Sequence, residues 1–282
     1  MHMITEKQLR SLKQWFADYV RPFRENSEIK ENIELKIEHT QRVCDEMRMI
    51  GEDLSLDIGA MRFAEILARF HDIGRFEQYQ QYKTFADALS VDHARFGVDI
   101  LRKEGVLNLL RPETRDLAYT CISYHNRASL PKDDDEECLF FSQMLRDADK
   151  LDIWRVVLAY YQRTDRKENK ALQLGLPDTP GISKQVQNDI LGHRIVKTDH
   201  LKNLNDFKLL QAGWVFDCNF PVTIRAVRDR GYIEALEQQL PKNKETTSIF
   251  DEIRHYLDDF DSTFIIDKKQ RLLSIQQKTH TL

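Results

Sequence analysis

Glycine and proline are scarce in this sequence, with 10 Gly and 7 Pro among 282 residues. This scarcity disfavours all-β architectures, which need many tight turns. The hydrophobic share of 41% and the charged share of 31% are ordinary for a globular protein and exclude wholesale disorder. A chain of this length can bury a substantial core in one large domain or two small ones.

Cysteines are also few, and neither charge is in large excess. The four cysteines include no C-x-x-C pair, which argues against a thiolate zinc site or a redox motif. Lys and Arg number 42 and Asp and Glu 46, giving a formal net charge of −4. A binding face for a nucleic-acid polymer needs clustered Lys and Arg, so we expect no such partner. A small anionic substrate needs only a few local cations.

Long apolar runs are missing. No stretch reaches the length of a transmembrane helix, and the polar residues 1–5 do not resemble the apolar segment of a signal peptide. A disulfide framework is improbable in a chain this long, which favours a reducing compartment. We therefore expect a cytoplasmic protein with no membrane partner. The sequence does not indicate its oligomeric state.

Helical periodicity dominates instead. Thr5 and Gln8 form a capping box ahead of a first helix. A third helix is expected to begin near Asp57, and Gly74 has the position of a glycine that ends it. Pro112 suits the first turn of a fifth helix. We predict an all-α fold.

The composition changes after residue 162. Residues 163 to 182 are charged at first and then contain Leu-Pro and Thr-Pro-Gly, which is typical of a long loop or lid. Helical patterns resume beyond it. We expect residues 1–162 to form a helical domain and residues 163–282 a loop plus a C-terminal helical extension packed on it, the two making one compact unit.

Four of the nine histidines recur with carboxylates at intervals of 32, 22, 32 and 24 residues, each close to one helix plus its connection. The set is His39, His71, Asp72, His93, His125 and Asp149. Each interval brings a residue from a different helix, and imidazole with carboxylate suits a divalent ion of Mn, Fe, Co, Ni, Zn or Mg.

Any one of these histidines, taken alone, fits an ordinary core or surface position. Asp149 could instead pair with Arg146 or Lys150, and Asp72 with Arg75. The joint pattern, rather than any single member, favours a metal site.

The order His39, His71-Asp72, Asp149 resembles the H…HD…D signature of the HD-domain superfamily of metal-dependent phosphohydrolases. The surrounding segments at residues 39–43, 70–75 and 147–152 also look like that family's motifs. A lone His-Asp pair is a weak signal, whereas the full ordered set on a helical background is a strong one. The resemblance covers roughly residues 30 to 160 and implies an HD-domain-like helical bundle.

The resemblance implies two sets of metal ligands. His39, His71, Asp72 and Asp149 would hold a first ion, with Asp149 preferred to Asp147 because of the A-D-x-x-D pattern. His93 and His125 would hold a second, bridged by Asp72, as in the two-metal branch of the superfamily. One or two divalent ions per chain are therefore expected.

The sequence departs from the motif of one group in the two-metal branch, and this difference limits which substrates are expected. The cyclic-dinucleotide phosphodiesterases of the two-metal branch have a second histidine where Asn126 stands, together with a GYP motif that is missing here. That substrate is disfavoured.

The expected activity is hydrolysis of a small phosphoester, such as a nucleotide-like metabolite, by metal-activated water. We expect Asp72, Arg42, Arg75 and Lys150 to act in catalysis, and Arg127 and Asn126 to bind substrate. The hydrolysis could be that of a phosphomonoester or a phosphodiester. Two other functions stay open: a mixed-valent di-iron oxygenase of the same superfamily, which uses the same six ligands, and a metal-stabilised binding module.

Overall fold

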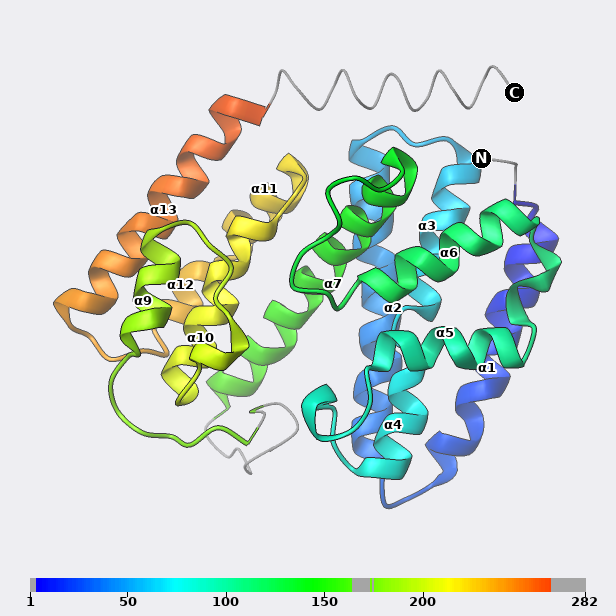
Figure 1. Cartoon of the computed structure of the whole chain (residues 1–282), viewed down its shortest axis with the longest axis horizontal. Helices are drawn as coiled ribbons and strands as arrows, with labels where there is room; N and C mark the ends of the chain where they lie inside the picture. The colour runs from blue at the N-terminus through cyan, green and yellow to red at the C-terminus, as the bar shows by residue number, and fades with distance from the viewer. Residues whose placement is uncertain (1–3, 164–172, 174, 265–282) are drawn as a thin grey trace. The chain divides into compact units, whose positions relative to one another are not determined.

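The computed structural model describes residues 4–163, 173 and 175–264, and these residues form an all-α fold with no strand among them, as predicted. Figure 1 shows the order of the helices along the chain. The helices of the first half are α1 (Glu6–Glu25), α2 (Lys30–Asp53), α3 (Ile58–Phe70), α4 (Gly74–Tyr82), α5 (His93–Lys103), α6 (Pro112–Tyr124) and α7 (Glu136–Gln162). Those of the second half are α9 (Lys184–Leu191), α10 (Leu204–Gly213), α11 (Pro221–Asp229), α12 (Tyr232–Glu237) and α13 (Lys244–Phe264).

The described chain divides into two compact units. The first ends at Asp149 and the second begins at Lys150, so the boundary falls inside α7. The division expected from the sequence, between residues 162 and 163, stays a prediction. The loop predicted at residues 163 to 182 lies partly outside the described residues, which omit 164–172 and 174.

The sequence features predicted at the starts of two helices, a capping box and a proline, are confirmed. At α1, the Thr5 hydroxyl accepts from the backbone N–H of Gln8, and the Gln8 side chain accepts from the backbone N–H of Thr5. This reciprocal pair satisfies backbone donors that a helix start leaves open. At α6, Pro112 occupies the first turn, where its missing N–H costs nothing.

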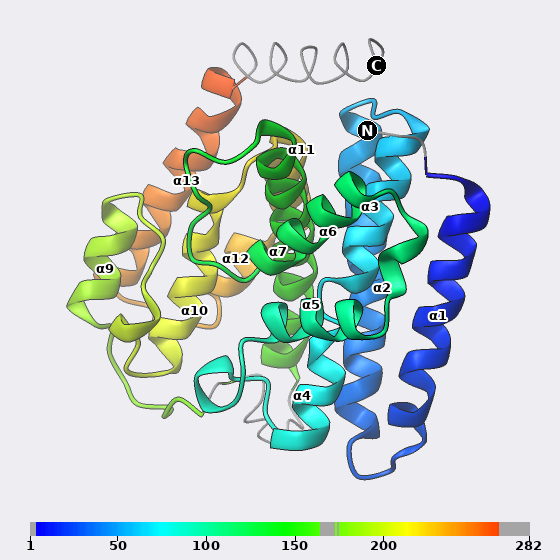
Figure 2. The same cartoon turned by 45° about the vertical axis from the view of Figure 1, so that its right-hand side comes forward.

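The first unit is built around α2 and α3, which pack along each other (Figure 2). α1 packs against both of them, while α4 packs against α5 and α5 against α6. The core between these helices is aromatic and aliphatic, with Phe63, Phe70 and Met47 fully buried. This packing fixes the ends of α3, α5 and α6 relative to α2.

Gly74 does not end the third helix, so that prediction was wrong. α3 ends at Phe70, and Gly74 is the first residue of α4. A Cβ atom at Gly74 would overlap the carbonyl oxygen of His93 and lie 2.8 Å from the backbone nitrogen of Gly97. Glycine is therefore needed because α4 and α5 approach each other backbone to backbone.

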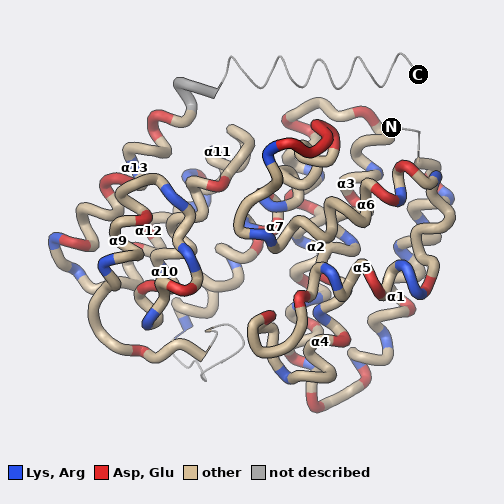
Figure 3. The backbone as a smooth tube through the Cα atoms, in the orientation of Figure 1, with Lys and Arg blue, Asp and Glu red and all other residues tan. Residues whose placement is uncertain are grey.

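The second unit has its own apolar core. Trp154, in the part of α7 that belongs to this unit, is fully buried, and its indole N–H donates to the carbonyl of Gln211 in α10 at 2.9 Å. Positively and negatively charged residues are interspersed along the described helices, and the acidic run at residues 133–137, where α7 begins, stands out (Figure 3). Within the described ranges, no helix is both long and apolar enough to cross a membrane.

Candidate metal centre

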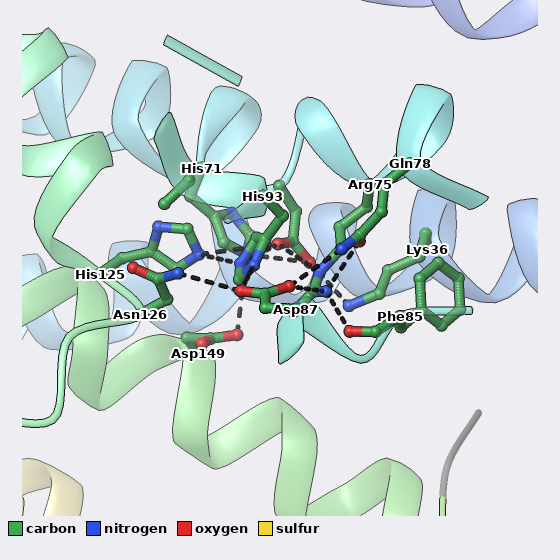
Figure 4. Close-up of polar contacts among 12 residues, drawn as sticks. Lys36, His71, Arg75, Gln78, Phe85, Asp87, His93, His125, Asn126 and Asp149 are labelled. Atoms are coloured by element: carbon green, nitrogen blue, oxygen red, sulfur yellow. Dashed lines mark hydrogen bonds and ion pairs between the residues drawn. The ribbon is translucent and has the colours of Figure 1, made fainter. Parts of the chain in front are cut away.

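The first unit brings the six histidine and aspartate residues singled out in the sequence together in space. Figure 4 shows His71, His93, His125 and Asp149 of this set. All four histidines are buried, and Asp72 is only 3% exposed. His39 lies within α2, His71 and Asp72 in the turn between α3 and α4, His93 at the start of α5, His125 directly after α6, and Asp149 in α7. Five different helices or helix ends thus contribute to one site.

The first group of donor atoms surrounds one oxygen of Asp72. The Nε2 atom of His39 lies 3.3 Å from Nε2 of His71, 3.1 Å from Oδ1 of Asp149 and 3.5 Å from Oδ2 of Asp72. Nε2 of His71 lies 3.6 Å from the same Asp149 oxygen. Two imidazoles and two carboxylates therefore face a common point.

The second group surrounds the other oxygen of Asp72. Nε2 of His93 lies 2.9 Å from Nε2 of His125, and these nitrogens lie 3.3 Å and 3.6 Å from Oδ1 of Asp72. Asp72 therefore divides its two oxygens between two pairs of histidines.

The hydrogen bonds of the rings determine which atoms face the centre. Nδ1 of His71 donates to the Ala68 carbonyl at 2.8 Å, and Nδ1 of His125 donates to the Ile122 carbonyl at 2.7 Å. Nδ1 of His93 donates to Oδ2 of Asp87 at 2.6 Å. In a neutral ring whose Nδ1 carries the proton, Nε2 presents a lone pair.

The direction and spacing of these lone pairs show whether the ligand atoms suit a metal ion. The lone pairs of His93 and His125 face each other at 2.9 Å beside a carboxylate oxygen, and neutral rings in this state cannot bond to each other. A cation between them satisfies all the donors at once. Ligand atoms about 2.1 Å from an ion at ordinary coordination angles lie about 3.0–3.4 Å apart, which is close to the separations found here. The residues fit a divalent ion.

The protonation states of the candidate ligands also suit a divalent ion. Burial lowers the pKa of His125 to about 4, a shift that the neighbouring rings reinforce and Asp72 opposes. Burial alone would raise the pKa of Asp72, but Lys36 and the nearby imidazoles hold it well below its usual range. Burial acts on Asp149 in the same way, and hydrogen bonds from His39 and His71 keep its pKa low. The site therefore combines a neutral ring with ionised carboxylates, the forms that bind metal.

Comparison with known protein families identifies the domain. Residues 37–154 match the family model of the HD domain. The chain contains an HD domain. The matched segment begins just before His39 and ends just after Asp149, so it includes all six candidate ligands. The resemblance to the HD domain that was noted in the sequence is therefore confirmed. No curated protein and no solved structure matches the chain.

Two cationic side chains also lie beside Asp72. Nζ of Lys36 lies 2.7 Å from Oδ2 of Asp72, and Nε of Arg75 lies 3.5 Å from Oδ1. Arg75 was expected near the site. Lys36 was not, although it precedes His39 by three residues and so lies on the same face of α2.

The other cations singled out in the sequence lie in different surroundings. Arg42 pairs with Glu38 at 3.3 Å, and the Arg127 guanidinium lies over the Tyr124 ring at 4.1 Å. Lys150 belongs to the second unit, where its ammonium lies 2.6 Å from Asp217. Their roles with substrate stay predictions.

Asn126 and Asp87 form the remaining side of the site. The Asn126 amide donates to Asp87 at 3.2 Å and to Asp92 at 3.0 Å. Burial would raise the pKa of Asp87, but His93 and Arg75 hold it far below its ordinary value. Asp87 therefore carries a negative charge on the outer side of the His93 ring. Sequence reasoning missed this residue.

The low pKa of His125 predicts acid sensitivity of the metal-free protein. The unfolded chain binds a proton at this ring below its ordinary pKa of 6.5, whereas the folded chain does so only near 4. The contribution of His125 to the free energy of unfolding is therefore fully present above pH 6.5 and is lost as the pH falls towards 4, by about 3 kcal/mol for a shift of this size. Denaturant unfolding between pH 7.5 and 4.5, with chelator present, should reveal the loss.

A His125→Asn variant should flatten this pH dependence, whatever its absolute stability. Replacing the exposed His255 by Asn should leave the dependence unchanged. An unaltered slope in His125→Asn would show that other groups cause the acid sensitivity.

Proposed function

We propose that the chain is a metal-dependent phosphohydrolase that acts on a small phosphoester. One observation supports this most strongly: the two oxygens of Asp72 face two separate pairs of histidines, each pair with its Nε2 atoms turned inward. The HD domain adds the expectation of phosphohydrolase chemistry. A nucleotide-like metabolite is the proposed kind of substrate.

In this proposal, the six residues divide into two ligand sets that share Asp72. His39, His71 and Asp149 would hold one ion together with Asp72, and His93 and His125 would hold the other. When bound, such ions supply hydroxide near neutral pH and neutralise charge on phosphoryl oxygens. The Nε2 atoms of His71, His93 and His125 need no rearrangement to bind, because their Nδ1 atoms are already bonded.

Cationic side chains would orient the phosphoryl group. Lys36 is 14% exposed, and its ammonium, with three donors, has one hydrogen bond to Asp72 among the described residues. Arg75 is held in place by Gln78, Phe85 and Asp87, which bond to its NH1. We assign phosphate contacts to Lys36 and Arg75, and keep Arg42, Lys150, Arg127 and Asn126 as further candidates.

Hydrolysis by the full-length chain is the direct test. The purified protein should hydrolyse members of a panel of phosphomonoesters and phosphodiesters when supplied with Mn²⁺, Mg²⁺, Co²⁺ or Ni²⁺. A His71→Ala variant with an unchanged circular dichroism spectrum should lose turnover. No hydrolysis of any ester with any ion would contradict the proposal.

The alternative is a mixed-valent di-iron oxygenase, since four imidazoles and a bridging carboxylate suit iron equally well. Two irons per chain, a mixed-valent electron paramagnetic resonance signal and no phosphatase activity would favour it. Metal binding without either activity would favour a metal-stabilised binding module.

A Lys36→Gln variant tests the role of the ammonium. Removing one charge-assisted hydrogen bond worth about 1.5–3 kcal/mol should lower kcat/KM about 10- to 100-fold, mainly through KM if Lys36 holds the phosphoryl group. Lys30→Gln, at the exposed start of the same helix, is the matched control and should retain wild-type kinetics. Equal kinetics for the two variants would remove Lys36 from the substrate site.

A further inference from the structure

Asp87 is bonded to more of the site than its place in the sequence suggests. It is the first residue of the short 3₁₀-helix η1 (Asp87–Leu89), between α4 and α5. Oδ2 accepts from Nδ1 of His93 at 2.6 Å and from Asn126 at 3.2 Å. Oδ1 accepts from Arg75 at 2.9 Å and from Gln78 at 3.0 Å. One carboxylate thus binds four side chains around the candidate second ion (Figure 4).

The need for Asp87 follows from the position of His93 in its helix. His71 and His125 lie at helix C-termini, so each Nδ1 reaches the carbonyl three residues earlier in its own helix. His93 is the first residue of α5 and has no such helical carbonyl behind it. The acceptor for its Nδ1 must come from another segment, and Asp87 provides it.

The same carboxylate also binds a second group that lies beside Asp72. Arg75 donates through NH1 to Oδ1 of Asp87, and its Nε lies 3.5 Å from Oδ1 of Asp72. Nε2 of His93 lies 3.3 Å from that Asp72 oxygen. Asp87 therefore holds two groups that meet at Oδ1 of Asp72.

We propose that Asp87 is the positioning residue of the second metal ion: it fixes the tautomer and direction of the His93 ring, so that the ion held by His93 and His125 depends on it while the ion held by His39, His71 and Asp149 does not. This inference rests on the ligand assignment of the proposed function. Carboxylates bonded to ligand histidines also raise their basicity, and their loss typically weakens metal affinity about 10- to 100-fold.

Calorimetric titration of the full-length chain with Mn²⁺ tests this without any activity assay. The wild type should bind two ions. Asp87→Ala should bind the first with unchanged affinity and the second about 10- to 100-fold more weakly. Asp87→Asn should lose less affinity than Asp87→Ala, because the amide oxygen still accepts from Nδ1. If Asp87→Ala does not fold, Asp87→Asn compared with wild type gives the answer.

Asp92→Ser is the matched control. Asp92 precedes His93 and caps α5 through the backbone N–H groups of Ala94 and Arg95. It has no hydrogen bond to the His93 ring among the described residues, and serine also caps helices well. This variant should bind both ions as the wild type does.

Three results with the variants would overturn the inference: two ions bound by Asp87→Ala within twofold of wild-type affinity, equal weakening of both ions, or the same selective loss in Asp92→Ser. A wild type that binds only one ion would overturn it too. Failure of the proposed function gives a different result. If the wild type binds two ions, the second of which depends on Asp87, but hydrolyses no phosphoester, the role of Asp87 stands and the phosphohydrolase activity is contradicted.

Discussion

Asp72→Asn should lose both metal ions and at least about 10³-fold of any metal-dependent hydrolysis. Asp72 is the residue that the two groups of donor atoms share, with Oδ2 facing His39 and Oδ1 facing His93. Asparagine has the same shape but only one carbonyl oxygen, and its amide hydrogens would point at the Nε2 atoms or the cation of one group. Metal ions contribute several kcal/mol to transition-state stabilisation, and 1.36 kcal/mol corresponds to a tenfold change in rate.

Metal content after dialysis and steady-state kinetics are the two measurements. Asp45→Asn, on the exposed surface of α2, removes the same charge away from the site and should retain both ions. Retention of one ion at wild-type affinity in Asp72→Asn would mean that the two groups bind independently of the shared carboxylate.

Gly74→Ala should destabilise the protein by about 3 kcal/mol or more. The added Cβ would meet backbone atoms of His93 and Gly97, which cannot rotate away as a flexible side chain can. Overpacking a close contact costs about 1–3 kcal/mol and more where the neighbour cannot move. At about 2–4 °C per kcal/mol for a protein of this size, the thermal midpoint should fall by about 6–12 °C.

The variant should also weaken metal binding, because moving α5 away from α4 moves His93 away from Asp72. Gly51→Ala is the matched control: it lies in a buried helical position, but its Cβ would meet the flexible side chain of Met61. A Gly74→Ala midpoint no lower than that of Gly51→Ala would contradict this explanation of the glycine.

The sequence predicted what local chemistry and ordered spacing encode. The capping box at Thr5 and Gln8 and the proline at the start of α6 depend on neighbours within a few residues. The candidate ligands were found because a histidine or aspartate recurred once per helix, so the order alone implied that the helices converge. The HD domain identified over residues 37–154 agrees with that implication.

The parts that sequence reasoning missed depend on contacts between distant segments. Asp87 carries no local signal, because its importance comes from the ring of His93 and the guanidinium of Arg75. Gly74 was assigned to a helix end, since the pattern of one helix cannot reveal that another backbone passes beside it. Lys36 had a signal, its position one turn before His39, but only the structure shows its bond to Asp72.

The wide separation of the candidate ligands has a consequence for folding kinetics. His39 and Asp149 are 110 residues apart in the sequence, and only His71 and Asp72 are neighbours. Closing such long loops is entropically costly, so the donor atoms meet only when most of the bundle has formed. An ion that binds there stabilises contacts made late, which slows unfolding and leaves the folding rate nearly unchanged. Bound metal ions would thus lower the unfolding rate of the native protein, whereas folding would not require them.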